Sequence, residues 1–451
     1  MQRGVGTEVQ AHCRQPGEQQ QRRPERFAAP LDGVETAAGA YSAVPGAGVD
    51  TAPGAGLRAS VGMSDIVLPG GASSGHSTGG VAASRSGHTD CGPAIRRVAG
   101  GVVRALCVRP GVKDSLSLVE MPEPPLEQGP VLVQGLSVGL CGTDVEIVSG
   151  AYGQAPPGHE LLVLGHENLG RVSAAPSGCG LNPGDLVVGI VRRPDPVPCP
   201  ACAAGEWDMC RNGRYTEHGI MGQDGFARER WRAQPDAVVT LDSSLERVGV
   251  LLEPTTIVAK AWEQIERIGT RAFFDPHVAV VTGAGPVGLL AALLGVQRGL
   301  EVHVFDRVSD GPKPALVADL GAHYHSESLP DSGVQGDVLL ECTGVPSVVL
   351  DTINCGALDA ITCLTGVSTP GTNTPVDIGG VNRNEVLRND VVFGSVNANR
   401  RHYQTAALAL RQADQGWLGR LITRRVPLED YQQAFARRDG DVKVVLELQG
   451  S

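Results

Sequence analysis

The feature that most constrains the fold is the glycine-rich run Gly283-Ala284-Gly285-Pro286-Val287-Gly288, which has the form G-x-G-x-x-G. It follows the apolar run VAVV, opens a segment with helical spacing, and leads to a second strand-like run, EVHVF. In such a unit the first glycine forms a tight turn, the second lets the backbone approach a pyrophosphate, and the third lets the helix pack against the strand. The run therefore predicts a parallel, doubly wound Rossmann sheet that binds a dinucleotide.

The second strand is followed by a pair of residues, Asp306 and Arg307, that bear on which dinucleotide binds. Asp306 lies eighteen residues past Gly288, where a carboxylate accepts hydrogen bonds from the adenosine ribose, so it favours NAD. Arg307 follows at once, and its guanidinium can pair with the 2'-phosphate of NADP. The sequence leaves both NAD and NADP open.

The chain around this unit divides into three parts. Residues 1–98 are rich in Gln, Gly, Ala, Ser and Pro, contain no lysine and show no sustained period, so we expect a disordered extension. One hypothesis is that translation begins further in, at Met63 or beyond. The remainder predicts an α/β protein, with a β-rich catalytic domain from residues 102–269 and 396–451 and a Rossmann domain over residues 270–395.

Charge, apolar content and cysteine use exclude several classes of function. The net charge is −11 and the isoelectric point is near 5.5, which argues against nucleic acid or an anionic membrane as the main partner. No run reaches the roughly eighteen apolar residues of a membrane span, and no signal-peptide pattern opens the sequence, so we expect a cytoplasmic protein. Three of the eleven cysteines crowd between Cys199 and Cys210, which in a reducing compartment favours metal over disulfides.

A second candidate site surrounds the stretch LGHENLGRV, residues 164–172. Gly165 permits a bend that lets His166 and Glu167 serve one site, although such a pair alone is more often an ordinary hairpin end. Cys141 ends an apolar run twenty-five residues before His166, and a thiolate with an imidazole makes a good pair of zinc ligands. A catalytic zinc needs three protein ligands and an open position, for which Glu167 and Glu253 are the further candidates.

These residues lie in strings that resemble the zinc-dependent medium-chain dehydrogenases of the alcohol dehydrogenase superfamily. The matching strings are CGTD at 141–144, GHENLGRV at 165–172, PGDLV at 183–187 and the glycine-rich run. The chain is more similar still to the glucose dehydrogenases of archaea and some bacteria, through RR at 192–193, GRYTEHGI at 213–220, DGF at 224–226, LLEP at 251–254 and SVNANRRHY at 395–403. The resemblance spans residues 102–451 and implies a GroES-like catalytic domain and a homodimer or homotetramer.

The resemblance also implies roles for individual residues. Cys141, His166 and Glu167 would surround a catalytic zinc, and Glu253 would reach it directly or through water. Thr143 would relay the proton of the substrate hydroxyl, and Glu217 and Asn397 would hold sugar hydroxyls. A second Gly-His-Glu run follows two prolines, and we interpret its His159 as a loop residue.

The cluster Cys199-x2-Cys202-x7-Cys210 has three of the four cysteines that the superfamily uses to bind a structural zinc. The position of the first cysteine falls at Pro196, which cannot ligate, although Asp195 can supply a carboxylate oxygen. We therefore predict a structural zinc held by Cys199, Cys202, Cys210 and Asp195. The alternative is a lobe that has lost its metal and keeps three free thiols.

Taken together, these features predict a glucose or aldose 1-dehydrogenase that passes hydride from the anomeric carbon of a sugar to NAD or NADP and gives the aldonolactone. One alternative is a zinc-dependent dehydrogenase of another polyol or of a secondary alcohol. A second alternative, from a different class, is a non-catalytic dinucleotide-binding redox sensor, which would need no zinc at Cys141.

Overall fold

The computed structural model describes residues 101–369, 371 and 374–449, and these residues belong to one compact unit. The predicted disordered extension over residues 1–98 lies outside the described residues. Within the described ranges, no helix is both long enough and apolar enough to cross a membrane.

The first part of this unit is built from β-strands that alternate buried and exposed positions, as strand β3 does over Val131–Leu140. A 7-stranded sheet has the order β11-β6-β5-β3-β19-β18, and β10 pairs with β3. The strands of two 3-stranded sheets, β2-β1-β4 and β7-β8-β9, alternate along the sequence with those of this larger sheet. The bounds are β1 Val102–Val108, β2 Ser117–Pro122, β4 Leu162–Val163, β5 Glu167–Ala174, β6 Leu186–Gly189, β7 Arg192–Arg193, β8 Thr216–His218, β9 Gly222–Gln223, β10 Arg230–Ala233 and β11 Val238–Leu241.

The second part is a 6-stranded parallel sheet with the order β14-β13-β12-β15-β16-β17. Numbered from its own first strand, this order is the 3-2-1-4-5-6 arrangement of a Rossmann fold. Its central strands β12 and β15 are almost wholly buried and mostly apolar, as expected of a parallel sheet covered by helices. The bounds are β12 Val278–Thr282, β13 Glu301–Phe305, β14 His323–His325, β15 Gly336–Glu341, β16 Gly356–Leu364 and β17 Val391–Gly394.

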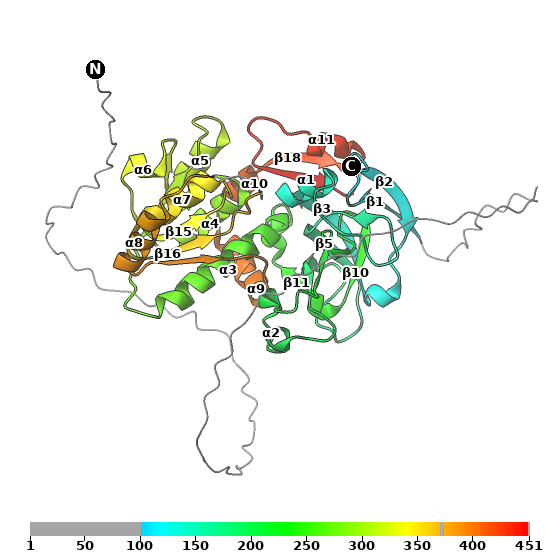
Figure 1. Ribbon diagram of the computed structural model, residues 1–451. Helices are drawn as coiled ribbons and strands as arrows, with labels where there is room; N and C mark the ends of the chain where they lie inside the picture. The colour runs from blue at the N-terminus through cyan, green and yellow to red at the C-terminus, as the bar shows by residue number, and fades with distance from the viewer. Residues whose placement is uncertain (1–100, 370, 372–373, 450–451) are drawn as a thin grey trace, which may run out of the picture. The chain divides into compact units, whose positions relative to one another are not determined.

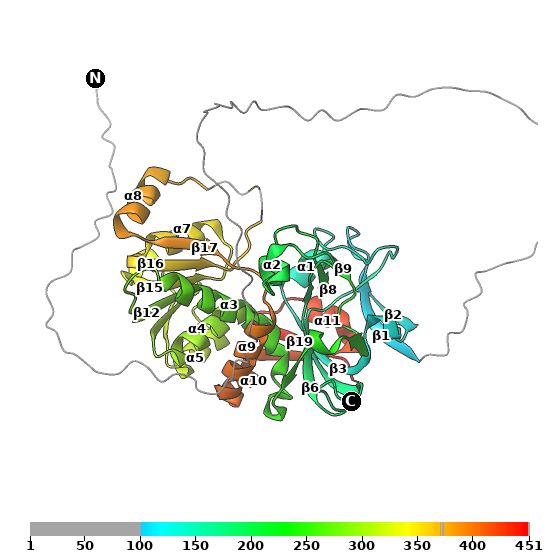
Figure 2. The same ribbon diagram turned by 90° about the horizontal axis from the view of Figure 1, so that it is seen from below.

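The longest helix described, α3 over Leu252–Gly269, was not anticipated, because the sequence analysis extended the β-rich segment to Gly269. Trp262 on α3 is buried, and its indole N–H donates to the carbonyl of Ala291 on α4 at 3.3 Å. Figure 2 shows α3 with α4 and α9 close by. The helix bounds are α1 Gly142–Val148, α2 Pro200–Ala203, α4 Pro286–Gln297, α5 Pro312–Asp319, α6 Leu329–Ser332, α7 Pro346–Asn354, α8 Ile378–Arg388, α9 Arg400–Gln412, α10 Gln415–Leu421 and α11 Tyr431–Phe435.

The C-terminal segment returns to the first sheet, as the sequence analysis expected of the tail. Strand β19, Lys443–Glu447, runs antiparallel to β3 with Val444 opposite Leu140. Strand β18, Ile422–Pro427, pairs with β19 in parallel, so β19 lies between strands from the two ends of the described chain. Figure 1 shows these late elements, in red, beside the early elements in cyan and green.

Candidate active site and metal centres

Cys141 and His166 face each other between the ends of two strands. Gly165 has a φ of +88°, which turns the chain between β4 and β5 and brings His166 out of that turn. Cys141 follows the last residue of β3 and is the N-cap of α1. Its Sγ lies 3.0 Å from His166 Nε2, and the histidine is 5% exposed. The structure thus brings together the two residues that the sequence analysis assigned to one site.

Asp144, which the sequence analysis did not single out as a ligand or support, lies behind this pair. Its fully buried carboxylate accepts the Cys141 backbone N–H at 2.9 Å and places Oδ1 3.5 Å from His166 Nδ1. A proton on Nδ1 leaves the lone pair of Nε2 for a ligand. Burial alone would lower the pKa of His166, but the negative charges of Cys141 and Asp144 raise it well above its usual range. The pocket thus favours a positive charge, and its sulfur and nitrogen donors fit zinc.

Two glutamates complete the neighbourhood of His166. The ligand atoms of His166, Glu167 and Glu253 lie within 4.8 Å of one another. Both carboxylate oxygens of Glu167 accept from Lys443 Nζ, at 2.7 and 2.6 Å, and the same ammonium donates to the Leu140 carbonyl at 3.0 Å. Burial raises the pKa of Glu253 to about 7. Glu167 is therefore held by a buried ammonium, whereas Glu253 sits in surroundings that disfavour its charge.

Glycine at position 139 makes room for the Glu167 carboxylate. Gly139 lies opposite Glu167 in the pairing of β3 with β5, and a Cβ there would meet Glu167 Oε2 at 2.1 Å. A side chain at this position would therefore displace the carboxylate from its place beside His166.

The predicted substrate residues, Glu217 and Asn397, touch although they lie 180 residues apart. Asn397 Nδ2 donates to Glu217 Oε1 at 2.6 Å, and the same oxygen accepts from Arg192 Nε and Nη2 at 3.1 and 3.0 Å. Asn397 has a φ of +62°, a left-handed conformation that asparagine tolerates better than most residues. The arrangement holds Glu217, a residue that is 7% exposed, in place through one of its carboxylate oxygens.

Two observations place this pair near the metal-ligand candidates. A Cβ on Gly219, just after β8, would lie 2.6 Å from the Gly165 carbonyl, so the Glu217 strand packs against the His166 turn. Burial raises the pKa of Tyr403, and the charges of Glu253 and Glu217 both add to that shift. Thr143, the predicted proton relay, lies partly buried in the first turn of α1, two residues after Cys141.

Two of the three glycines in the dinucleotide run are required by close neighbours, and the third leaves open space at the start of a helix. Gly283 has a φ of +97°, and a Cβ there would lie 2.8 Å from Thr343 Cγ2. A Cβ on Gly288 would lie 1.7 Å from the Gly283 carbonyl oxygen, so the third glycine lets α4 pack on β12. Nothing stands within 4 Å of the Cβ position of Gly285, which is the N-cap of α4. Pro286 and Val287 begin the helix there, and its amino terminus favours a phosphate.

Asp306 lies at the end of β13, as predicted, but it has a cation beside it. Its Oδ2 accepts from Ala284 N–H and from Lys313 Nζ, both at 2.8 Å, and Oδ1 accepts from Val308 N–H at 3.1 Å. Burial would raise the pKa of Asp306, but the Lys313 bond and these N–H groups lower it. Arg307 is exposed next to it. A half-buried carboxylate and two cations therefore share the predicted ribose site.

The three lobe cysteines come together, whereas Asp195 has other partners. Ligand atoms of Cys199, Cys202 and Cys210 lie within 4.8 Å of one another, and Arg211 N–H donates to Cys199 Sγ and lowers the pKa of that thiol to about 6. The Asp195 carboxylate accepts from Val197 N–H at 3.0 Å, from Asn212 Nδ2 at 2.7 Å and from Arg214 Nε at 3.2 Å. The cysteines fit a zinc site, and Asp195 would have to leave these donors to complete it.

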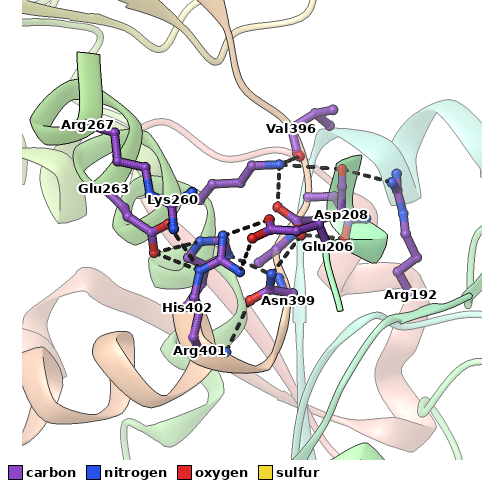
Figure 3. Close-up of polar contacts among 12 residues, drawn as sticks. Arg192, Glu206, Asp208, Lys260, Glu263, Arg267, Val396, Asn399, Arg401 and His402 are labelled. Atoms are coloured by element: carbon purple, nitrogen blue, oxygen red, sulfur yellow. Dashed lines mark hydrogen bonds and ion pairs between the residues drawn. The ribbon is translucent and has the colours of Figure 1, made fainter. Parts of the chain in front are cut away.

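A buried polar network joins the cysteine-containing segment, residues 199–210, to helix α3 and to the segment before α9 (Figure 3). Asp208 lies in the 3-10 helix Trp207–Met209, and its Oδ2 is 2.9 Å from Lys260 Nζ. The two side chains are 0% and 1% exposed. Lys260 also donates to the Val396 carbonyl at 2.9 Å, and Asn399 Nδ2 donates to Asp208 Oδ1 at 2.7 Å. The ammonium thus anchors the residue next to Asn397.

Comparison with known proteins identifies the family. Two family models match the chain: the alcohol dehydrogenase GroES-like domain over residues 127–243 and the glucose dehydrogenase C-terminus over residues 246–448. The chain is 37% identical over 357 residues to a glucose 1-dehydrogenase of Methanocella arvoryzae, a match that covers 77% of this chain and 99% of that protein. The chain belongs to the glucose 1-dehydrogenase family. A member of this family from Thermoproteus tenax is 40% identical over 353 residues, covering 77% of this chain and 100% of that protein.

A solved structure of the glucose 1-dehydrogenase family supports the same assignment. The glucose dehydrogenase of Haloferax mediterranei, in complex with NADP, Zn and gluconolactone, is 31% identical and superimposes with a TM-score of 0.72 over 77% of this chain and 100% of that one. These matches confirm the predicted likeness to zinc-dependent medium-chain dehydrogenases and the α/β fold class with a GroES-like part and a Rossmann part.

Sequence reasoning about this family member missed the residues that support the site rather than form it. Asp144 carried a local signal, since it lies three residues after Cys141 as the acid of a capping box. The rarity of lysine was a second signal. The chain has only four lysines, and three of them are Lys260, Lys313 and Lys443. His159, interpreted as a loop residue, is exposed between β4 and α1.

Proposed function

We propose that this chain is a glucose 1-dehydrogenase that oxidises the anomeric carbon of an aldose, passes the hydride to NAD(P)+ and releases the aldonolactone. Membership of the family supports the reaction class, and the contact between Glu217 and Asn397 beside the His166 turn is the observation that supports a sugar. Carboxylate and amide groups held in this way match the hydroxyl groups of a polyol, because they offer both acceptors and donors.

The metal-ligand candidates have separate roles in the proposal. Cys141 and His166 would hold zinc, with Glu253 or Glu167 as the third ligand, and bound zinc supplies a Lewis acid that lowers the pKa of the substrate hydroxyl. Asp144, whose Oδ1 lies 3.5 Å from His166 Nδ1, would hold the tautomer and orientation of His166, and Lys443 holds the Glu167 carboxylate. Because Lys443 holds both oxygens of Glu167, we favour Glu253 as the third ligand.

The chain's own groups bind the reactants and move the proton. Glu217, positioned by Arg192, accepts a hydrogen bond from a sugar hydroxyl, and Asn397 donates to one. Thr143 passes the hydroxyl proton towards water. The glycine turn and the amino terminus of α4 hold the pyrophosphate, and orientation of both reactants is the main contribution of the two parts of the fold.

The ribose site accommodates either coenzyme in this proposal. Asp306 accepts from the ribose hydroxyls of NAD+, while Lys313 and the exposed Arg307 offset its charge when a 2'-phosphate is present. We further propose that residues 102–269 and 396–451 form the catalytic domain and residues 270–395 the dinucleotide domain. The protein would act in the cytoplasm as a homodimer or homotetramer, which light scattering of the purified protein would test.

The proposed function is tested with Cys141→Ala and a substrate panel. The zinc-loaded protein is assayed with glucose, galactose, xylose, sorbitol and 2-propanol against NAD+ and NADP+, and zinc content is measured. We expect turnover of aldoses, loss of turnover in Cys141→Ala with retained NADPH binding, and no change in the control Cys179→Ala. Glu217→Gln should raise the KM for glucose and leave the KM for coenzyme unchanged.

Each contrary result has a defined meaning. Unchanged turnover in Cys141→Ala would refute the zinc assignment. Activity on sorbitol or 2-propanol without activity on aldoses would favour the alternative dehydrogenase. Dinucleotide binding without zinc and without turnover of any substrate would favour the redox sensor.

A further inference from the structure

The edge of the Rossmann sheet carries a cluster of histidines and glutamates away from the site described above. Strand β14 is the edge strand, and it pairs in parallel with β13 so that His303 lies opposite His323. Residues two apart on a strand share one face, so Glu301 and His303 on β13 project from the same face as His323 and His325 on β14. The register therefore gathers three imidazoles and a carboxylate on one face of two strands.

The side-chain atoms of this cluster converge on Glu301. Its Oε1 lies 3.1 Å from His303 Nε2 and 3.6 Å from His323 Nε2. The ligand atoms of the three residues are all within 4.8 Å of one another. The rings of His303 and His323 are stacked, with centroids 4.8 Å apart and an angle of 27° between their planes. Two imidazole nitrogens and a carboxylate oxygen are thus presented together on strands, which are rigid supports for ligands.

A supporting chain of contacts stands behind His303. Its other nitrogen, Nδ1, is 2.9 Å from His325 Nε2, and His325 Nδ1 is 3.0 Å from Glu327 Oε1. His325 in turn stacks on Phe305, with centroids 4.4 Å apart. Metal-binding histidines commonly have their second nitrogen held by such a partner, because the partner fixes the ring and its tautomer.

The proton count along this chain favours a cation at His303 Nε2. Without one, His303 Nε2 needs a proton to bond Glu301 and His325 Nδ1 needs one to bond Glu327, so the bond between the two rings requires a third proton on one ring or the other. With a cation on Nε2, His303 donates from Nδ1 to His325 Nε2, and a neutral His325 donates from Nδ1 to Glu327.

We propose that Glu301, His303 and His323 form a binding site for a divalent transition metal such as Zn²⁺, separate from the catalytic and cysteine sites. Imidazole nitrogen suits zinc, copper and nickel, and two histidines with a carboxylate leave the fourth zinc position for water. The side chains of Glu301 and His323 are 57% and 59% exposed, so an ion from solution can reach the site. Binding would join the edge strand to its neighbour.

Zinc itself is the probe. Wild-type protein, His323→Ala, Glu301→Gln and the control His277→Ala, which removes another exposed histidine, are dialysed against the same buffered free zinc concentration, and bound zinc per chain is measured. We expect the wild type and His277→Ala to hold one more zinc per chain than the two cluster variants. All four proteins should keep the same dinucleotide affinity and the same turnover, which shows that the variants are folded.

Two further measurements sharpen the result. Zinc titration in buffers of different ionisation enthalpy should release about one more proton from the wild type than from His323→Ala, as the proton count requires. Excess zinc should raise the melting temperature of the wild type and of His277→Ala more than that of His323→Ala. Equal zinc content in all four proteins would overturn the proposal, whatever the outcome for the catalytic site, since that site is tested separately by Cys141→Ala.

Discussion

Replacing Lys260 by methionine tests whether its buried pair with Asp208 supports both the fold and the sugar site. Methionine keeps an apolar stem but removes an ammonium that lies 2.9 Å from Asp208 Oδ2 and 2.9 Å from the Val396 carbonyl. Since both side chains of the pair are at most 1% exposed, the Asp208 carboxylate stays buried, and breaking such a pair costs about 3–5 kcal/mol. With an unfolding entropy of about 2.1 cal/mol/K per residue over roughly 350 residues, 4 kcal/mol lowers the melting temperature by about 5 °C.

The assay is thermal unfolding of zinc-saturated Lys260→Met, Asp208→Asn and the double variant. The loss of unfolding free energy in the double variant should be smaller than the sum of the two single losses by about 2 kcal/mol or more, because neither charge remains buried. The control is Arg420→Met, which breaks an ion pair with Asp319 whose side chains are 52% and 50% exposed, and it should cost less than about 1 kcal/mol.

Kinetics separate a local role of Lys260 from a general loss of stability. Because Lys260 anchors the residue before Asn397, Lys260→Met should raise the KM for glucose and leave the KM for coenzyme unchanged well below the melting temperature. A melting temperature within about 1 °C of the wild type, or single-variant effects that simply add, would refute the reasoning.

Further predictions concern the coenzyme and the pH dependence of stability. Arg307→Ala should raise the KM for NADP+ about tenfold and leave that for NAD+ nearly unchanged in steady-state kinetics, because its guanidinium would pair with the 2'-phosphate; equal effects on both would contradict this. Gly285→Ala should fold normally and lose affinity in an NADH fluorescence titration, whereas Gly288→Ala, with its Cβ 1.7 Å from a carbonyl oxygen, should also lower the melting temperature; identical melting temperatures would count against the steric argument. Burial lowers the pKa of His402 to about 4. As the pH falls from about 6.5 to 4, the unfolded chain therefore binds a proton at this histidine that the folded chain does not bind. The free energy of unfolding should fall by up to about 3 kcal/mol over this range. His402→Gln keeps an acceptor for the backbone N–H of Asn399, the N-cap residue of α9. This variant should flatten the dependence of unfolding free energy on pH in urea titrations, and an unchanged dependence would show that another group titrates.

The parts of the site that lie close together in sequence were predictable from local rules. The turn at Gly283 to Gly288 needs glycines for reasons that the pattern itself states, and the structure gives Gly283 and Gly288 separate steric reasons while leaving open space at Gly285. The bend at Gly165 was predicted in the same way, from the need to bring His166 out of a strand. The family resemblance then related Cys141 and Glu253 to His166 across longer stretches of sequence.

The supporting residues were not predictable, because they come from distant strands whose register the sequence does not state. Lys443 reaches Glu167 only because β19 pairs with β3, and Arg192 reaches Glu217 only through the pairing of β7 with β8. Composition held a usable signal: three of the chain's four lysines, Lys260, Lys313 and Lys443, pair with Asp208, Asp306 and Glu167. In a chain that otherwise uses arginine, a compact ammonium stands where a carboxylate must be held in little space.

The position of strand β19 has a consequence for synthesis of the protein. Strand β3 ends at Leu140, and its partner begins at Lys443, about 300 residues later. At roughly 5–20 residues per second, the ribosome needs about 15–60 s to deliver that partner. During this interval the part of β3 that pairs with β19, Ser137–Leu140, has no partner on that side and Glu167 lacks its ammonium, so the nascent chain exposes a short strand edge that invites aggregation. The strands of the Rossmann part follow one another without such a gap, whereas the GroES-like part is completed only after strand β19 emerges.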